Sequence, residues 1–129
     1  MRNGIGFLSG QFPIIDGKLA YAGRVGAELT PAQGAEAAAA AAMNVLAQIR
    51  KLLGTFDQLE GLLRLDGYVA SADTFLGQPA VLDAASELLI AALGEKGRHA
   101  RTAVSTARLP LNAPIELAVT FAVKGPRPS

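Results

Sequence analysis

Hydrophobic positions along the chain alternate in some segments and recur at helical spacing in others, which divides the sequence into strands and helices. Ile5–Ser9 is predicted as a short strand. A little further on, Asp16 and Gly17 stand between apolar residues in the segment IIDGKL, a pattern typical of a tight hairpin turn. Leu59–Ser71 predicts a longer strand in the middle of the chain.

The first helix has a recognisable start signal at its N-terminus and a stop signal at its C-terminus. Thr30 is placed to cap the helix, Pro31 suits its first position, and Gln33 has the spacing of a capping box. The helix is predicted to run through an alanine-rich stretch to Leu53 and to end at Gly54.

A second helix is predicted to follow the central strand. It begins at Asp73 or Leu76, continues to Leu93 and ends at Gly94. Pro79 either sits in its first turn or separates a short turn from the helix proper. Helices that alternate with strands in a chain of this length indicate an α+β two-layer sandwich, with both helices on one face of the sheet.

The last part of the chain predicts two strands, His99–Arg108 and Pro114–Val123, joined as a hairpin by the segment LPLNA. If Arg108 pairs with Pro114 across the turn, Arg101 lies opposite Phe121 and roughly 16 Å from Glu116 along the hairpin. One subunit would then not bring Arg101 and Glu116 together, which favours a shared site between two subunits.

The final strand predicts how the two faces of the sheet differ. Large apolar residues occupy alternate positions of this strand, and the helices are expected to cover them. The opposite face carries mostly small residues with one carboxylate, Glu116. Such a face suits close approach of another subunit, so we expect a homo-oligomer, although an exposed and weakly polar face is the alternative. The large residues are Ile115, Leu117, Val119, Phe121 and Val123.

Composition narrows the function classes. The chain has 129 residues, half of them hydrophobic, a formal net charge of +1, no cysteine and one histidine, His99. These counts exclude disulfides, thiolate catalysis and cysteine-bound zinc, and they give no support to a broad nucleic-acid-binding surface. The most apolar stretch, residues 35–53, is interrupted by polar side chains and predicts no membrane span. Without a secretory signal pattern near Met1, a cytoplasmic protein is expected.

Four segments together resemble the RidA/YjgF family. They are FLSGQFPIIDGKL, AAMNVLAQIRKLLG, LLRLDGYVASADTF and ARTAVSTARLPLNAPIEL, and they occur in the family's order from Phe7 to Val123. The resemblance implies a single chorismate-mutase-like domain over residues 1–123, with a mixed sheet and two helices on one face. The proline-containing and polar segment KGPRPS predicts a flexible tail at residues 124–129. It also implies a homotrimer with three clefts between subunits.

The resemblance further implies hydrolysis of small enamines or imines to keto acids and ammonia, with no metal or organic cofactor. Arg101 would bind the substrate carboxylate, because a guanidinium offers a planar fork that matches it. Glu116 would handle a proton or position water. Ser9 and Gly10 would line the cleft. His99 is a further candidate for proton transfer, and an interface hydrogen bond is the alternative for it.

The chain also departs from the family's familiar deaminases. It has His99-Ala100-Arg101 where they have Pro-Ala-Arg, and it lacks their aromatic residue near the N-terminus. Their asparagine in the second helix corresponds to Asp83. A trimer that binds small carboxylates without catalysis is therefore the second hypothesis, so whether the protein is an enzyme stays open. An endoribonuclease or translation inhibitor is the third and weakest, because the charge is near neutral.

Overall fold

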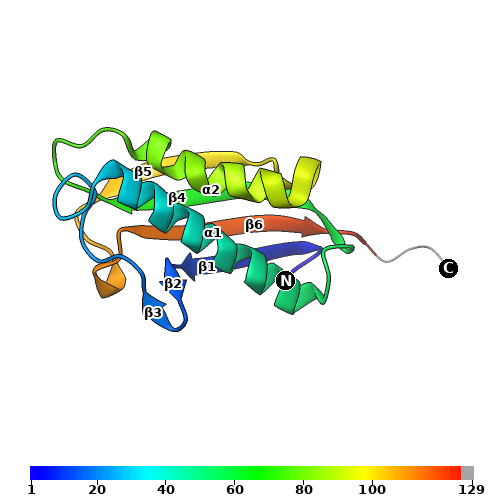
Figure 1. Cartoon of the computed structure of the whole chain (residues 1–129). Coiled ribbons are helices and arrows are strands. Elements are labelled where there is room, and N and C mark those ends of the chain that lie inside the picture. Colours follow the sequence, from blue (N-terminus) through cyan, green and yellow to red (C-terminus); the bar gives the residue numbers. More distant parts are fainter. Residues whose placement is uncertain (126–129) are drawn as a thin grey trace.

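The computed structural model describes residues 1–125, in which two helices cover one face of a four-stranded sheet (Figure 1). The α+β two-layer prediction is confirmed. The N-terminal strand is longer than predicted and ends at Gln11. Residues 126–129 of the predicted tail lie outside the described residues. In chain order the elements are β1 (Ile5–Gln11), β2 (Ile14–Ile15), β3 (Lys18–Leu19), α1 (Pro31–Leu53), β4 (Leu59–Ala70), α2 (Gln78–Leu93), the 3₁₀ turn η1 (Gly94–Gly97), β5 (Ala100–Thr106), the 3₁₀ turn η2 (Pro110–Asn112) and β6 (Ile115–Val123).

Helix α1 has the predicted ends because both are determined by local hydrogen bonds. The Thr30 hydroxyl accepts from the backbone N–H of Gln33, and the Gln33 side chain accepts from the backbone N–H of Thr30. At the other end the Gly54 N–H donates to the carbonyl of Arg50. Four alanines on one face of the helix are fully buried, which lets α1 approach the sheet and α2 closely; they are Ala37, Ala38, Ala41 and Ala42.

Helix α2 begins later than predicted. Its first residue is Gln78, directly before Pro79, and Gly77 precedes it. A proline lacks the N–H that an interior helical position needs, so Pro79 fits only in the first turn. Residues 73–77 therefore form a loop rather than the start of a helix, and α2 ends at Leu93 as predicted.

The sheet order is β1-β6-β4-β5, so the predicted hairpin between the last two strands is wrong. Strand β5 pairs with β4 in parallel, and β6 lies between β4 and β1, antiparallel to both. A strand, helix and strand in succession commonly form a parallel βαβ unit, and β4, α2 and β5 do so here. Arg101 consequently pairs with Leu65 of β4 instead of facing Phe121.

The core lies between the sheet and the two helices. The inward row of β6 is buried from Ile115 to Phe121, as the alternation predicts, whereas Val123 is only half-buried. The predicted turn at Asp16 and Gly17 is also present, and it joins β2 to β3. Asn44 of α1 contacts the start of this hairpin. Its Nδ2 donates to the carbonyl of Phe12 at 2.8 Å and to the carbonyl of Ile14 at 2.9 Å.

Candidate functional site

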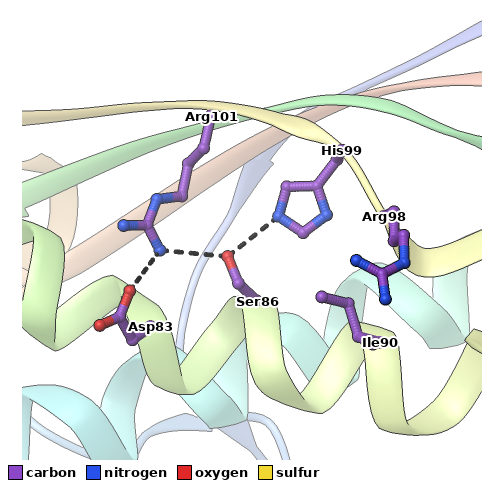
Figure 2. Close-up of a pocket in the computed structure, with 6 residues that line it drawn as sticks. All are labelled: Asp83, Ser86, Ile90, Arg98, His99 and Arg101. Atoms are coloured by element: carbon purple, nitrogen blue, oxygen red, sulfur yellow. Dashed lines mark hydrogen bonds and ion pairs between the residues drawn. The ribbon is translucent and has the colours of Figure 1, made fainter.

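A pocket of about 250 Å³ lies between α2 and the start of β5 (Figure 2). Helix α2 contributes one wall with side chains spaced three and four residues apart, which places them on one face of the helix. The strand and the residues before it contribute three cationic or titratable side chains. The lining residues are Asp83, Ser86, Ile90, Arg98, His99 and Arg101.

Arg101 reaches across the pocket toward α2. Its Nη1 donates to Asp83 Oδ1 at 2.9 Å and to Ser86 Oγ at 3.2 Å, and its Nη2 donates to the Pro79 carbonyl at 3.3 Å. Of the five N–H bonds of the guanidinium, two therefore have no partner among the described residues. The side chain is only 23% exposed. Arg101 is therefore a half-buried cation that α2 holds in place, with two N–H bonds left without a partner among residues 1–125.

His99 lies directly before β5, in the same pocket as Arg101. Its Nδ1 is 2.6 Å from the carbonyl oxygen of Gly97, and its Nε2 is 2.9 Å from Ser86 Oγ. A carbonyl oxygen only accepts, so Nδ1 carries the proton. In the neutral ring Nε2 is then an acceptor, and the Ser86 hydroxyl donates to it.

Glu116, Ser9 and Gly10 form a second group, on β1 and β6. Strand β1 pairs irregularly with β6 between Leu8 and Gln11, and this irregularity contains Ser9 and Gly10. Gly10 has φ of +59°, and a Cβ there would lie 3.6 Å from Glu116 Oε2. Such irregularities often occur beside functional sites because they redirect side chains.

The structure does not bring the two groups together within one chain. Arg101 shares a sheet row with Leu65 and lies on the helix-covered side, whereas Glu116 shares a row with Tyr68 on the open face. The two rows are three residues apart, about 10 Å along the strands, and β5 and β6 are separated by two strand spacings, roughly 9.5 Å. Arg101 and Glu116 are therefore apart within one chain, as the sequence led us to expect, although the topology that separates them is a different one.

The open face of the sheet carries exposed apolar side chains around an ion pair. Phe7 is 68% exposed, and Tyr68 and Val104 are each more than a third exposed. Between them, Arg64 Nε donates to Asp66 Oδ1 at 2.8 Å. Across the strands, Arg64 also contacts the hydroxyl of Thr102. Exposed aromatic groups on a sheet face favour burial against another chain.

Sequence reasoning missed Ser86. It drew attention to Asp83 only through the resemblance and did not connect Asp83 to Arg101. A serine inside a helix has no distinctive pattern, and only its spacing from Asp83 and Ile90 places it on the pocket-facing side. Within residues 1–125, no group of three or more His, Cys, Asp or Glu side chains could hold a metal ion. No helix of the described part is long and apolar enough to cross a membrane.

Residues 4–123 match the family model described as "YjgF/chorismate_mutase-like, putative endoribonuclease". Protein TCP17 of Trypanosoma cruzi is 39% identical over 111 residues, which cover 85% of this chain and 69% of that protein.

Solved structures with a similar fold include the following two. Protein Atu1372 of Agrobacterium tumefaciens superposes with a TM-score of 0.94 and 38% identity, covering 96% of this chain and 79% of that one. Escherichia coli TdcF, solved with bound serine, superposes with a TM-score of 0.65 and 16% identity, covering 97% and 84%. The predicted chorismate-mutase-like fold is confirmed.

Proposed function

Because the chain belongs to the YjgF/chorismate-mutase-like family, we propose that it hydrolyses small carboxylated enamines or imines to keto acids and ammonia. The observation that carries this proposal is the state of Arg101, a half-buried guanidinium held by α2 with two N–H bonds left for a ligand. A planar carboxylate fits these donors. The serine bound to Escherichia coli TdcF carries a carboxylate of the same kind.

The proposed reaction needs one binding group and one proton-handling group. Arg101 holds the substrate carboxylate while the β-carbon of the enamine takes up a proton, so that the C=C bond is lost and a C=N bond of an iminium forms. Water then adds to the carbon of the C=N bond, and ammonia leaves to give the keto acid. Glu116 is suited to position this water or take its proton, and His99 is the other candidate for proton transfer.

We propose that the complete site forms between subunits of a homotrimer. Arg101 and Glu116 lie in different rows and on different sides of the sheet, so one chain does not supply both to one ligand. In a ring of three identical subunits, Arg101 of one chain can meet Glu116, Ser9 and Gly10 of the next. The exposed aromatic groups of the open face support such an assembly.

The first experiment is a turnover assay on 2-aminoacrylate and related imines generated in situ. We expect wild-type protein to accelerate keto-acid formation above the spontaneous rate. Arg101→Ala and Glu116→Gln should each lose this acceleration while remaining trimeric by light scattering. Turnover that survives Arg101→Ala would contradict the proposal.

A subunit-mixing experiment tests the shared cleft. Inactive Arg101→Ala and Glu116→Gln proteins are unfolded together in equal amounts and refolded into mixed trimers. Random association places an intact Arg101 beside an intact Glu116 in about a quarter of the clefts. We therefore expect recovery of about a quarter of wild-type turnover. No recovery would show that the two residues do not act across one interface.

The second candidate function is a trimer that binds small carboxylates without catalysis. It is favoured by Asp83, which already occupies Nη1 of Arg101, and by His99 at the position where the deaminases have proline. It predicts carboxylate binding that requires Arg101, without turnover. RNA cleavage is the weaker alternative, and only cleavage that survives Arg101→Ala and repeated purification would favour it.

A further inference from the structure

The Ser86 hydroxyl lies between the imidazole of His99 and the guanidinium of Arg101. Its hydroxyl donates to His99 Nε2 at 2.9 Å, and its oxygen accepts from Arg101 Nη1 at 3.2 Å (Figure 2). The far side of the imidazole is fixed, because Nδ1–H donates to the Gly97 carbonyl at 2.6 Å. The series of contacts thus selects the tautomer in which Nε2 accepts the serine proton.

We propose that Ser86 is an activated nucleophile that accepts acyl groups from small esters, an activity distinct from the proposed imine hydrolysis. A weak nucleophile such as serine is activated when an adjacent base takes its proton and a third group orients that base. Here His99 is the base and the Gly97 carbonyl orients it. The Arg101 guanidinium stabilises negative charge that develops on the serine oxygen or on the carbonyl oxygen of the ester.

The acylation step is a simple exchange of bonds. Ser86 Oγ transfers its proton to His99 Nε2 and attacks the carbonyl carbon of the ester, forming a tetrahedral oxyanion. The oxyanion collapses, the bond from carbon to the ester oxygen breaks, and the leaving alcohol takes the proton from Nε2. Water repeats the sequence on the acyl-serine and releases the carboxylic acid, which restores Ser86 and neutral His99.

The pocket indicates which esters would fit. A volume of about 250 Å³ accommodates a short acyl group, and Ile90 provides an apolar surface for it. Arg98 lies at the rim, where its ion pair with Glu95 is formed by side chains 67% and 86% exposed. Such an exposed pair is weak, so Arg98 is free to exchange Glu95 for an anionic group on the substrate. Small esters with a short acyl chain, and preferably an acidic group, are the expected class.

Ser105 of strand β5 is a suitable control for the reactivity of Ser86. Ser105 Oγ lies 2.7 Å from Ser71 Oγ, and its hydroxyl has no imidazole partner. Ser105 is also more exposed than Ser86, so a reagent reaches it at least as easily. A difference in reactivity between the two serines therefore reports on the His99 and Arg101 contacts rather than on access.

The experiment exposes the intact protein to p-nitrophenyl acetate, follows release of p-nitrophenolate, and maps the acetyl group by peptide mass spectrometry. We expect acetyl on Ser86 and none on Ser105 at matched times. Ser86→Ala should remove this acetylation, and His99→Gln should slow it about a hundredfold, the usual contribution of a general base. Ser105→Ala should leave it unchanged.

The Ser86→Ala variant is expected to fold, because alanine is the better helix former inside α2. Acetylation of Ser86 no faster than Ser105, or unaffected by His99→Gln, would overturn the proposal. The experiment measures acetylation of one serine by mass spectrometry and uses no imine substrate. Failure of imine hydrolysis is therefore distinguishable from failure of this inference.

Discussion

Arg101 of β5 and Asp83 of α2 form an ion pair with 2.9 Å between Nη1 and Oδ1. The Asp83 side chain is 56% exposed, whereas Arg101 is 23% exposed. The carboxylate therefore sits at the solvent side of a fixed cation and already offsets part of its positive charge. A pair exposed to this degree contributes less than about 1 kcal/mol.

Removing the charge of Asp83 is expected to strengthen carboxylate binding. In Asp83→Asn, a small keto acid no longer competes with a resident carboxylate for Arg101, and its Kd should fall about three- to tenfold by calorimetry. Glu28→Gln is the control, because it removes one negative charge from the neighbourhood of Arg24 and Arg108 instead. An unchanged Kd in Asp83→Asn would show that carboxylates do not bind at Arg101.

Elements determined by neighbouring residues were predictable from the sequence. The capping box of Thr30 and Gln33 and the turn at Asp16 and Gly17 depend on contacts within a few residues, so local patterns sufficed. The pairing of β5 was not predictable in this way. The short LPLNA connection suggested a hairpin, whereas tertiary packing places β4 between β5 and β6.

The candidate site was likewise predictable only where local sequence determines it. The sequence and the resemblance singled out Arg101, His99 and Glu116, but the strand beside which Arg101 lies follows from the parallel pairing of β4 and β5. Ser86 belongs to the site because α2 packs against β5. Its contacts with His99 and Arg101 span 13 and 15 residues, and no local pattern encodes them.

Gly97 is expected to be intolerant of any side chain. A Cβ there would lie 2.4 Å from the Leu89 carbonyl oxygen and 2.8 Å from the Ile90 Cα, both backbone atoms of α2. Gly97→Ala should therefore push η1 away from the helix and lower the free energy of unfolding by about 1–3 kcal/mol. Denaturant unfolding at a fixed protein concentration measures this loss.

The same substitution should also disturb His99, because the Gly97 carbonyl accepts from its Nδ1. Gly125→Ala is the matched control, since a Cβ at that position meets no heavy atom within 4 Å. Gly97→Ala with control-like stability would contradict the close packing of η1 against α2.

Asn44 is expected to be required for a stable β2–β3 hairpin. Its two hydrogen bonds, to the carbonyls of Phe12 and Ile14, link α1 to the first residue of this hairpin and to the residue two positions before it. Asn44→Ala should lower the free energy of unfolding by about 2 kcal/mol, the sum of two modest hydrogen bonds. Gln48→Ala, at an exposed amide one turn along the same helix, should change it by less than about 0.5 kcal/mol. Equal effects of the two substitutions would argue against this role.

Tyr21 is expected to titrate at a higher pH than an ordinary tyrosine. A hydrogen bond from its hydroxyl to the Glu36 carboxylate raises the pKa of the phenol, and burial and the negative charge of Glu36 add to the effect. The fold thus favours the protonated phenol over the phenolate. This contribution to stability is fully present below the unfolded pKa of about 10 and is lost as pH rises through the folded pKa.

The phenolate absorbance of Tyr21 measures this shift directly. The chain has two tyrosines, so the titration is made in a Tyr68→Phe background, where Tyr21 gives the whole signal. We expect a pKa above about 10 in this protein and a return toward that value after Glu36→Ala, which removes both the acceptor and its charge. A midpoint that is the same with and without Glu36 would contradict the Tyr21–Glu36 contact, and with it the attachment of this loop to α1.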